Sequence, residues 1–287
     1  MKNKNFIRII PKLDIKNGML IKGINLEGLR VLGDPFNFAR YYYENLADEI
    51  CYIDNVATLY GTNNLSNFIS DTAKNIFIPI SVGGGIKTID DVKRIFNAGA
   101  DKICINSAAI EKPKFISKIA RIFGSANITI IIEYIKIDNK YFITKSTGRD
   151  TVRIDPIKWA KIVEKEGAGE IFLTSVNHEG LKKGFDIKVI NKISKNASIP
   201  IIAHGGAGEI KHVIELVKKT NVSGVALSSL LHYDIANSFK IKNRTVGNFN
   251  YLESNSKIKK PKKERERPTS LSNGHSITNS LVLSVKW

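Results

Sequence analysis

Residues 77–85 read FIPISVGGG, and residues 198–206 read SIPIIAHGG. Each copy is a short apolar run that ends in glycines, as a buried parallel strand does where it passes into a turn. Counted from the proline of each copy, the two are 121 positions apart. The sequence ADEI at 47–50 returns as AGEI at 168–171 with the same offset. A repeat with constant spacing predicts two structurally equivalent halves.

The rest of the chain alternates short apolar runs with segments of helical periodicity. One such segment, 89–98, carries two aspartates in its first turn, and another, 155–166, opens with an Asp-Pro pair typical of a helix N-terminus. Strands that alternate with helices form a parallel sheet. The predicted strands are 8–13, 49–53, 78–82, 102–105, 128–133, 170–173, 200–203 and 224–227.

The repeat decides between a closed barrel and an open sheet. DIK at 14–16 pairs less closely with EYIK at 133–136, at an offset of 119, so three elements recur at a nearly constant spacing. Two halves of four strands can bury their faces symmetrically in a closed barrel but not in an open sheet. We therefore predict an α/β fold, a single (β/α)8 TIM barrel built from two half-barrel repeats, over residues 1–248.

The charge of the chain does not by itself indicate a nucleic-acid-binding protein. The formal net charge is +17, but the lysines are scattered and aromatic residues do not interleave with them. Residues 250–287 hold eight Lys/Arg and three Asp/Glu, a net +5. We predict that 249–287 form a disordered, basic, low-complexity tail. The remaining charge fits a solvated surface that attracts anionic substrates.

The start of the chain and its cysteines argue against a secreted, a membrane-spanning or a metal-binding protein. The apolar stretch near the N-terminus stops at Pro11-Lys12, too early for a signal peptide, and no run reaches the 18–20 apolar residues of a membrane helix. Cys51 and Cys104 lie in apolar segments without a metal-binding spacing. We expect two buried thiols in a cytoplasmic protein, and no metal or organic cofactor.

Two carboxylates are the candidate catalytic groups. Asp14 ends the first predicted strand and Glu133 ends the fifth, so the repeat places them at equivalent positions across the barrel mouth. The active sites of such barrels lie at the C-terminal ends of the strands. Opposed carboxylates suit general acid and base catalysis if their environments separate their pKa values. The alternative is that Lys16, Lys22 or loop amides merely neutralise each carboxylate.

The glycines after the repeated strands predict two anion sites. Glycine allows backbone N–H groups to approach a phosphate closely, and the loops after strands 7 and 8 are the usual barrel phosphate site. Two symmetric sites imply an elongated bisphosphate that spans the mouth. The candidate ligands are Gly84, Gly85, Asn106 and Ser107 in one half, and Gly205, Gly206, Ser228 and Ser229 in the other.

Further polar residues lie at or near strand ends. Lys22 either contacts substrate, steadies Asp14 or is simply solvated, and Asp54 and Thr174 are candidates for binding polar substrate groups. For the lone histidines His204 and His232, we expect hydrogen-bonded structural roles rather than catalysis.

Taken together, the motifs resemble a known enzyme family. They are RIIPKLD at 8–14, VGGGI at 82–86, GADK at 99–102 followed by INSAA at 105–109, GAGEI at 167–171 followed by TS at 174–175, and GGAG at 205–208. In this order they resemble the cyclase subunits of imidazole glycerol phosphate synthase, in the histidine-biosynthesis barrel family. The resemblance covers roughly residues 6–245.

The resemblance implies a reaction and a partner. A glutaminase subunit would release ammonia, which would enter the barrel from its N-terminal face. The cyclase would join this ammonia to a bisphosphorylated ribulosyl aminoimidazole carboxamide ribotide and release imidazole glycerol phosphate and aminoimidazole carboxamide ribotide. Asp14 matches the first catalytic aspartate, and Glu133 stands where the second belongs. Arg8, Glu49, Lys102 and Glu170 match the charged ammonia gate, and Asp101 matches a position at the glutaminase interface.

Some positions depart from the family pattern. Glu133 replaces an aspartate, and Glu179 replaces the aspartate of the Asp-Gly turn completed here by Gly180. His204 stands where a small serine is usual. Because a misplacement near 1 Å can lower a rate about a hundredfold, the longer Glu133 matters. These changes resemble a divergent branch of the family.

Three alternatives follow. The divergent branch is thought to support glutamine-dependent amidation of a nucleotide sugar in surface-polysaccharide synthesis. A non-catalytic scaffold that activates a glutaminase is a second alternative. A related barrel isomerase is a third, but it needs no gate at the barrel bottom, so the four gate residues argue against it.

Overall fold

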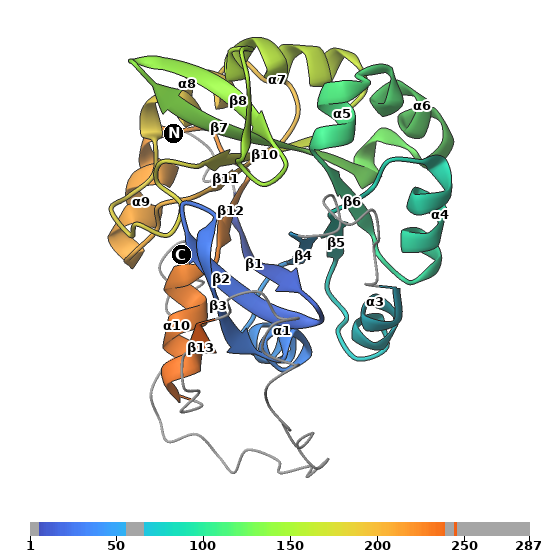
Figure 1. The fold of residues 1–287 in the computed structure, drawn as a ribbon, viewed down its shortest axis with the longest axis vertical. Coiled ribbons are helices and arrows are strands. Elements are labelled where there is room, and N and C mark those ends of the chain that lie inside the picture. The colour runs from blue at the N-terminus through green and yellow to red at the C-terminus, as the bar shows by residue number, and fades with distance from the viewer. Residues whose placement is uncertain (1–5, 56–65, 239–243, 246–287) are drawn as a thin grey trace.

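The structure, a computed structural model, describes residues 6–55, 66–238 and 244–245. Eight parallel strands form a closed barrel, as the sequence predicted, with helices around its outside (Figure 1). The barrel strands are β1 (Arg8–Lys16), β4 (Ile50–Asp54), β5 (Ile80–Gly83), β6 (Lys102–Ile105), β7 (Ile128–Ile137), β10 (Glu170–Ser175), β11 (Ile201–His204) and β12 (Gly224–Leu227).

Strand pairing follows chain order around the barrel and closes between the last strand and the first. β1 pairs with β4 on one side and with β12 on the other, in register from Arg8–Gly224 to Pro11–Leu227. The helices are α1 (Pro35–Glu44), α3 (Ser66–Ala73), α4 (Ile89–Asn97), α5 (Ser107–Glu111), α6 (Lys114–Phe123), α7 (Pro156–Lys165), α8 (Ile187–Ser194), α9 (Ile210–Lys219) and α10 (Ser229–Ser238), with a short 3₁₀ turn η1 (Ser125–Asn127).

The two halves are equivalent beyond the motifs that predicted them. α1 and α7 each begin with an Asp-Pro pair, in which Asp34 and Asp155 cap the backbone N–H groups of the first turn. These caps are also 121 positions apart. The first strand of each half continues into an antiparallel extension, formed by β2 (Met19–Ile24) and β3 (Glu27–Gly33) after β1, and by β8 (Lys140–Lys145) and β9 (Asp150–Val152) after β7.

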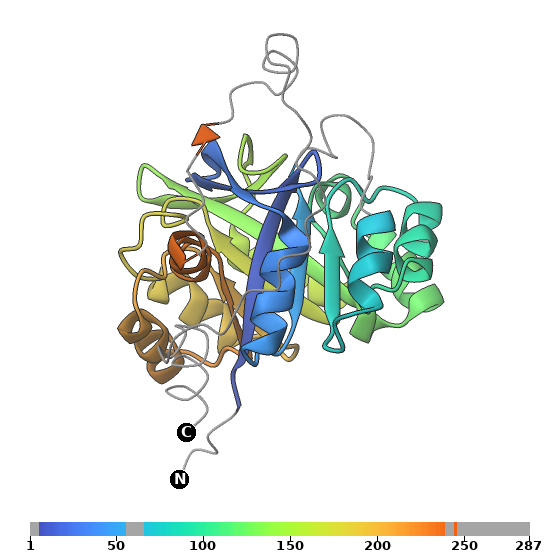
Figure 2. The ribbon, with the colours of Figure 1, turned by 90° about the horizontal axis from the view of Figure 1, so that it is seen from below.

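These extensions lie at one end of the barrel, which is the C-terminal end of its strands (Figure 2). The extensions were not expected from the sequence, and β1 and β7 are longer than expected because they continue into these extensions. The short strand β13 (Arg244–Thr245) pairs with β3. The predicted tail, 249–287, lies outside the described residues.

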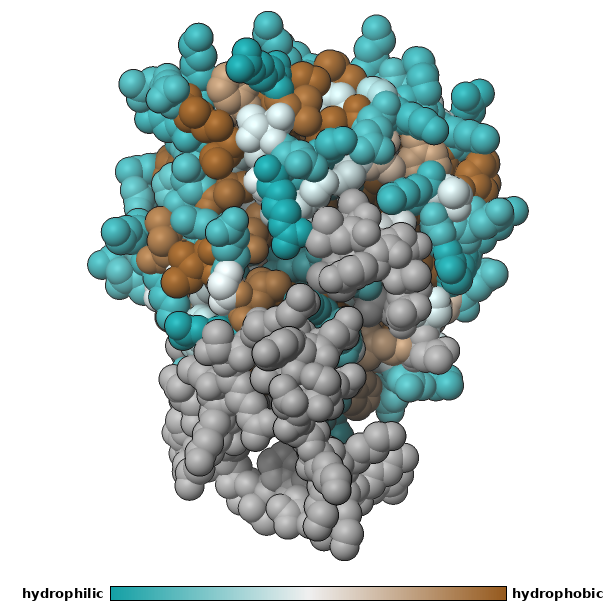
Figure 3. Space-filling model, in the orientation of Figure 1, coloured by the Kyte–Doolittle hydropathy of each residue, from teal (hydrophilic) through white to brown (hydrophobic). Residues whose placement is uncertain are grey.

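Hydrophobic residues form two separate cores. The larger lies between the strands and the surrounding helices. The smaller fills the middle of the barrel and consists of Ile10, Cys51, Ile53, Cys104, Ile131, Phe172, Ile202 and Ala226. On the face of the molecule in Figure 3, hydrophilic residues are spread over the visible surface rather than gathered in one patch.

Candidate active site

The interior of the barrel has three layers, because side chains alternate sides along a strand. On β1, Arg8, Ile10, Lys12 and Asp14 share the inward side. Arg8 lies in a charged layer at the strand starts, Ile10 belongs to the apolar middle layer, and Lys12 and Asp14 belong to a polar layer at the strand ends. The polar layer lies at the end where active sites of this fold are built.

Asp14 and Glu133 both lie in the polar layer, on the equivalent strands β1 and β7. Asp14 is buried, and its carboxylate is paired with the ammonium of Lys12. Glu133 is half-buried and accepts hydrogen bonds from the Asn106 side-chain amide and the Gly148 N–H, each 3.0 Å long. Of the neutralising partners considered for Asp14, neither Lys16 nor Lys22 forms an ion pair with it.

The environments of the two carboxyl groups move their pKa values in opposite directions. Burial raises the pKa of Glu133 to about 7, against the smaller opposing effects of Lys12 and the Gly148 N–H. For Asp14, burial acts upward as well, but attraction to Lys12 and Lys22 outweighs it and holds the pKa below its ordinary value. At neutral pH the site therefore contains an ionised Asp14 and a Glu133 that can still carry its proton, the separation that acid–base catalysis requires.

The raised pKa of Glu133 implies that the stability of the fold depends on pH. A carboxyl group whose pKa is higher in the folded than in the unfolded chain destabilises the fold progressively as pH rises from its ordinary value of 4.5 to about 7. Glu133→Gln should therefore increase the free energy of unfolding by about 1–2 kcal/mol at pH 8 and by less at pH 5. This value is lower than the full pKa shift implies, because solvent reaches the group and screens its charge. Urea unfolding at both pH values checks this, and a gain independent of pH would contradict it.

Lys12 also lies in the polar layer, at a position that the sequence motifs did not single out. It was quoted within the RIIPKLD motif but given no role. A lysine at an inward position of a barrel strand, between an apolar residue and an aspartate, was the available signal. Its side chain is 6% exposed. Its carbonyl oxygen accepts hydrogen bonds from the Ser228 hydroxyl at 2.9 Å and from His232 Nε2 at 2.8 Å.

The two histidines have hydrogen-bond partners within the barrel wall. His232 is fully buried between the Lys12 carbonyl and the Tyr42 hydroxyl, 2.5 Å from its Nδ1, and burial lowers its pKa to about 3. His204 Nδ1 lies 3.3 Å from the Thr174 hydroxyl and its Nε2 lies 3.4 Å from that of Ser228. Burial also lowers the His204 pKa well below its ordinary range, so both rings are neutral at neutral pH.

The first-half glycine turn opens into a hollow of roughly 500 Å³, solvent at its mouth included. Gly84 and Gly85 have φ values of 102° and 66°, a region that favours glycine. A Cβ on Gly84 would lie 2.3 Å from the Asp54 carbonyl oxygen. The hollow is also lined by Asn106, Ser107 and Glu133, so the structure brings the predicted anion ligands of this half beside one of the carboxyl groups.

The second-half turn is more enclosed than the first. Gly205 and Gly206 are buried, with φ values of 93° and 114°, against the loop 176–186 that follows β10. Ser228 follows the neighbouring strand β12, and Ser229 begins α10, whose N-terminus favours an anion.

The close contact between Gly206 and this loop leads to a second prediction about stability. A Cβ on Gly206 would lie 2.0 Å from the Gly184 carbonyl oxygen. Gly206→Ala should therefore destabilise the protein by about 1–3 kcal/mol more than Gly124→Ala. Gly124 also has a positive φ of 86°, but a Cβ there would have nothing within 4 Å. Urea unfolding of both variants checks this, and equal losses would show that the loop yields freely.

The loop 176–186 also carries Glu179 and Gly180. Glu179 is buried and paired with Lys22 of β2, both side chains being 2% exposed, and His204 Nε2 lies 3.7 Å from its carboxylate. Glu179 Oε2 has no hydrogen-bond partner among the described residues. Gly180 packs against β2, since a Cβ there would lie 2.8 Å from the Gly23 carbonyl oxygen. Lys22 thus lies in the polar layer, paired with the loop rather than solvated.

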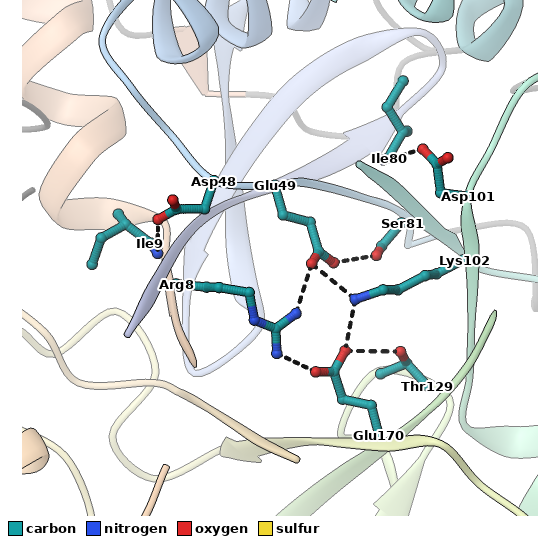
Figure 4. Close-up of polar contacts among 10 residues, drawn as sticks. All are labelled: Arg8, Ile9, Asp48, Glu49, Ile80, Ser81, Asp101, Lys102, Thr129 and Glu170. Carbon is teal, nitrogen blue, oxygen red and sulfur yellow. Dashed lines mark hydrogen bonds and ion pairs between the residues drawn. The ribbon is translucent and has the colours of Figure 1, made fainter. Parts of the chain in front are cut away.

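The charged layer at the strand starts is a closed ring (Figure 4). Arg8 contacts Glu49 at 2.9 Å and also Glu170, while Lys102 contacts Glu49 at 3.0 Å and Glu170 at 3.2 Å. Opposite charges alternate around it, so the ring is neutral. Ser81 and Thr129 also donate hydrogen bonds to its carboxylates.

Asp101 lies beside the ring at the N-terminal face. It is exposed, and one carboxylate oxygen accepts a 2.8 Å hydrogen bond from the Ile80 N–H. This bond joins the starts of β5 and β6, so Asp101 has a structural contact whether or not it binds a partner.

Some features are absent from the described residues. No cluster of three or more His, Cys, Asp or Glu there is placed to hold a metal ion, and no helix there has the length and apolarity needed to cross a membrane. Fold and site together define a (β/α)8 barrel whose strand ends carry two carboxyl groups with oppositely shifted pKa values, near two glycine turns.

Comparisons with known proteins identify the family. The family model described as histidine biosynthesis protein matches residues 8–237. Over 206 residues the chain is 48% identical to imidazole glycerol phosphate synthase subunit HisF of Legionella pneumophila, covering 71% of this chain and 97% of that protein. Identity to proteins of the same name is 43% in Bacillus cereus, covering 83% and 94%, and 41% in Lactococcus lactis, covering 84% and 94%. The chain belongs to this histidine biosynthesis family.

Proposed function

We propose that the chain is the cyclase subunit of an imidazole glycerol phosphate synthase. It would join ammonia to a bisphosphorylated ribulosyl aminoimidazole carboxamide ribotide and release imidazole glycerol phosphate and aminoimidazole carboxamide ribotide. The names of the relatives support this reaction, and the observation that carries it is the carboxyl pair. Asp14 and Glu133 come from equivalent strands and have oppositely shifted pKa values.

The pair supplies the proton transfers that this reaction needs. When ammonia condenses with the ketone of a ribulosyl group, nitrogen loses protons and the carbonyl oxygen leaves as water. Glu133, which still carries its proton in part of the molecules at neutral pH and lines the hollow, would donate to the departing oxygen. Asp14, held ionised, would accept a proton from nitrogen. No metal ion or organic cofactor takes part in this proposal.

Two anion sites would hold the two phosphates. One comprises Gly84, Gly85, Asn106 and Ser107, and the other comprises Gly205, Gly206, Ser228 and Ser229. They follow equivalent strands of the two halves, so a bisphosphate bound to both would cross the mouth above the carboxyl pair. Thr174, Glu179, Gly180 and Lys22 would position the second phosphate and the adjoining sugar, because they surround that end of the layer.

Ammonia would enter through the ring of Arg8, Glu49, Lys102 and Glu170, which would act as a gate. Above the ring, the apolar middle layer offers no charge to retain a neutral molecule. A glutaminase subunit would dock on the N-terminal face and form a heterodimer, with Asp101 at the interface. Support comes from three large, well-exposed apolar side chains that precede strands on this face: Phe6, Leu46 and Phe77. Buried free thiols at Cys51 and Cys104 agree with a cytoplasmic location.

The test is turnover of the bisphosphate substrate by the purified chain with excess ammonium at mildly alkaline pH, where free ammonia is plentiful. We expect formation of both products without a glutaminase. A folded chain that binds phosphate but forms neither product would overturn the proposal. Amidation of a nucleotide sugar would then be assayed. Activation of a glutaminase without any turnover would indicate a scaffold.

A further inference from the structure

We propose that Lys12 is a positioning residue for this reaction: its buried ammonium holds the Asp14 carboxylate and thereby decides which carboxyl group of the pair is the base. The inference rests on the proposed function, but one of its two tests requires no turnover.

The Lys12 side chain points into the barrel and is buried there beside Asp14. It precedes Asp14 by two residues on β1, so both side chains point inward, and they are 6% and 4% exposed. The ammonium donates a hydrogen bond to Asp14 Oδ1. The Lys12 backbone is fixed by Ser228 of the β12 end and by His232 of α10, which bind its carbonyl oxygen. Strand β1 itself pairs with β4 and β12.

The charged and titratable groups around the pair come from several neighbouring elements. They are Lys22 on β2, Cys51 on β4, Glu133 on β7, Glu179 on the loop 176–186, His204 on β11 and His232 on α10. The two histidines are neutral at neutral pH. Lys22 is engaged with Glu179. Within residues 6–55, 66–238 and 244–245, Lys12 is therefore the only cation in ion-pair contact with Asp14.

Without that cation, the electrostatics would favour a proton on Asp14. Burial, the largest single effect, would oppose its ionised form, and the weaker attraction of Lys22, which forms no ion pair with Asp14, would be the main effect left to favour it. With Lys12 present, attraction outweighs burial, and the pKa of Asp14 falls below its ordinary range. The pKa of Lys12 itself is raised despite burial, because Asp14 and Glu179 attract its charge, so it remains a cation.

The lysine also makes the two halves of the barrel chemically different. At the 119-residue offset that relates Asp14 to Glu133, the position equivalent to Lys12 is Ile131, an apolar residue of the middle layer. Glu133 consequently has no lysine two residues before it on its strand, and burial keeps its pKa high. A lysine present in only one half of the barrel thus helps to separate the two carboxyl groups into one base and one acid.

The kinetic test compares Lys12→Met with Lys12→Arg. For Lys12→Met we expect the acidic limb of the pH profile of kcat/KM to move up by about one pH unit or more, since a nearby opposite charge typically shifts a carboxyl pKa by about 1–3. The change should lie mainly in kcat, and Lys12→Arg should restore the profile in part. An acidic limb that does not move in Lys12→Met would overturn the proposal.

The second test follows the Asp14 carboxyl group directly by ¹³C NMR, with its signal assigned by loss in Asp14→Asn. We expect Asp14 to titrate at higher pH in Lys12→Met and at its wild-type pH in the control Lys16→Met, which also removes one charge from β1. An unchanged titration would contradict the role of Lys12. A shifted titration in a chain without cyclase activity would refute only the proposed function. If Lys12→Met does not fold, Lys12→Gln is compared in the same way.

Discussion

Asp14→Asn should lower kcat of the ammonium-dependent reaction by about 10²–10⁴-fold, the usual contribution of a positioned acid or base. Asparagine keeps the shape of the side chain but cannot accept a proton from the attacking nitrogen. Because Asp14 also compensates the buried Lys12 charge, the variant should be less stable as well. Binding of the bisphosphate substrate should change much less than kcat, since the glycine turns that would hold the phosphates are unaffected. Steady-state kinetics under saturating ammonium measures both.

The matched control is Asp90→Asn. Asp90 lies in the first turn of α4, and its side chain is 91% exposed, so the same chemical change should leave kcat unaffected. Unfolding in urea shows whether Asp14→Asn is folded under assay conditions. A folded Asp14→Asn variant with kcat within a few-fold of the wild type would remove Asp14 from the mechanism.

Lys22→Met should produce the largest loss of stability, about 3–5 kcal/mol in the free energy of unfolding. Removal of one member of a buried ion pair leaves the other charge uncompensated in a low-dielectric interior. Lys22 and Glu179 are each 2% exposed, and Glu179 has only one oxygen engaged by a hydrogen bond among the described residues. The pair also attaches the loop 176–186 to β2, so affinity for the substrate should fall with stability. Urea unfolding and substrate titration measure the two effects.

Two further variants test whether the buried charge causes the stability loss of Lys22→Met. Arg40→Met breaks an exposed pair with Glu44 on α1, and should change stability by no more than about 1 kcal/mol. The double variant Lys22→Met with Glu179→Leu removes both charges and should recover much of the stability lost in the single variant. A Lys22→Met variant as stable as Arg40→Met would show that the buried pair contributes little.

The sequence predicted the barrel well because its strands leave a local signal. Each is a short apolar run followed by glycines or polar residues, and the repeat at 121 positions identifies equivalent elements without knowledge of their contacts. The antiparallel extensions after β1 and β7 were not predicted. Residues 19–33 mix apolar and charged side chains, and the pairing of β2 with β3 contains register shifts that blur an alternating pattern.

The candidate site was predicted in position but not in its pairings. Asp14 and Glu133 could be placed at the mouth because strand ends determine position in this fold. That Asp14 is paired with Lys12, and Lys22 with Glu179, depends on which inward side chains meet after closure, and those partners lie up to 157 residues apart. Side chains alternate sides along a strand, so the inward position of Arg8 on β1 implies that Lys12, four residues later, also points into the barrel.

The acid–base assignment is tested most directly by the pH dependence of kcat/KM in the wild-type protein, measured at a fixed concentration of free ammonia. A fixed concentration removes the titration of ammonium itself from the profile. We expect the rate to fall as pH rises through about 7, where Glu133 loses its proton. Below that pH we expect a plateau that persists until Asp14 becomes protonated, at a pH below the ordinary range of aspartate. A rate that stays constant or rises through neutral pH would contradict the assignment of Glu133 as the acid.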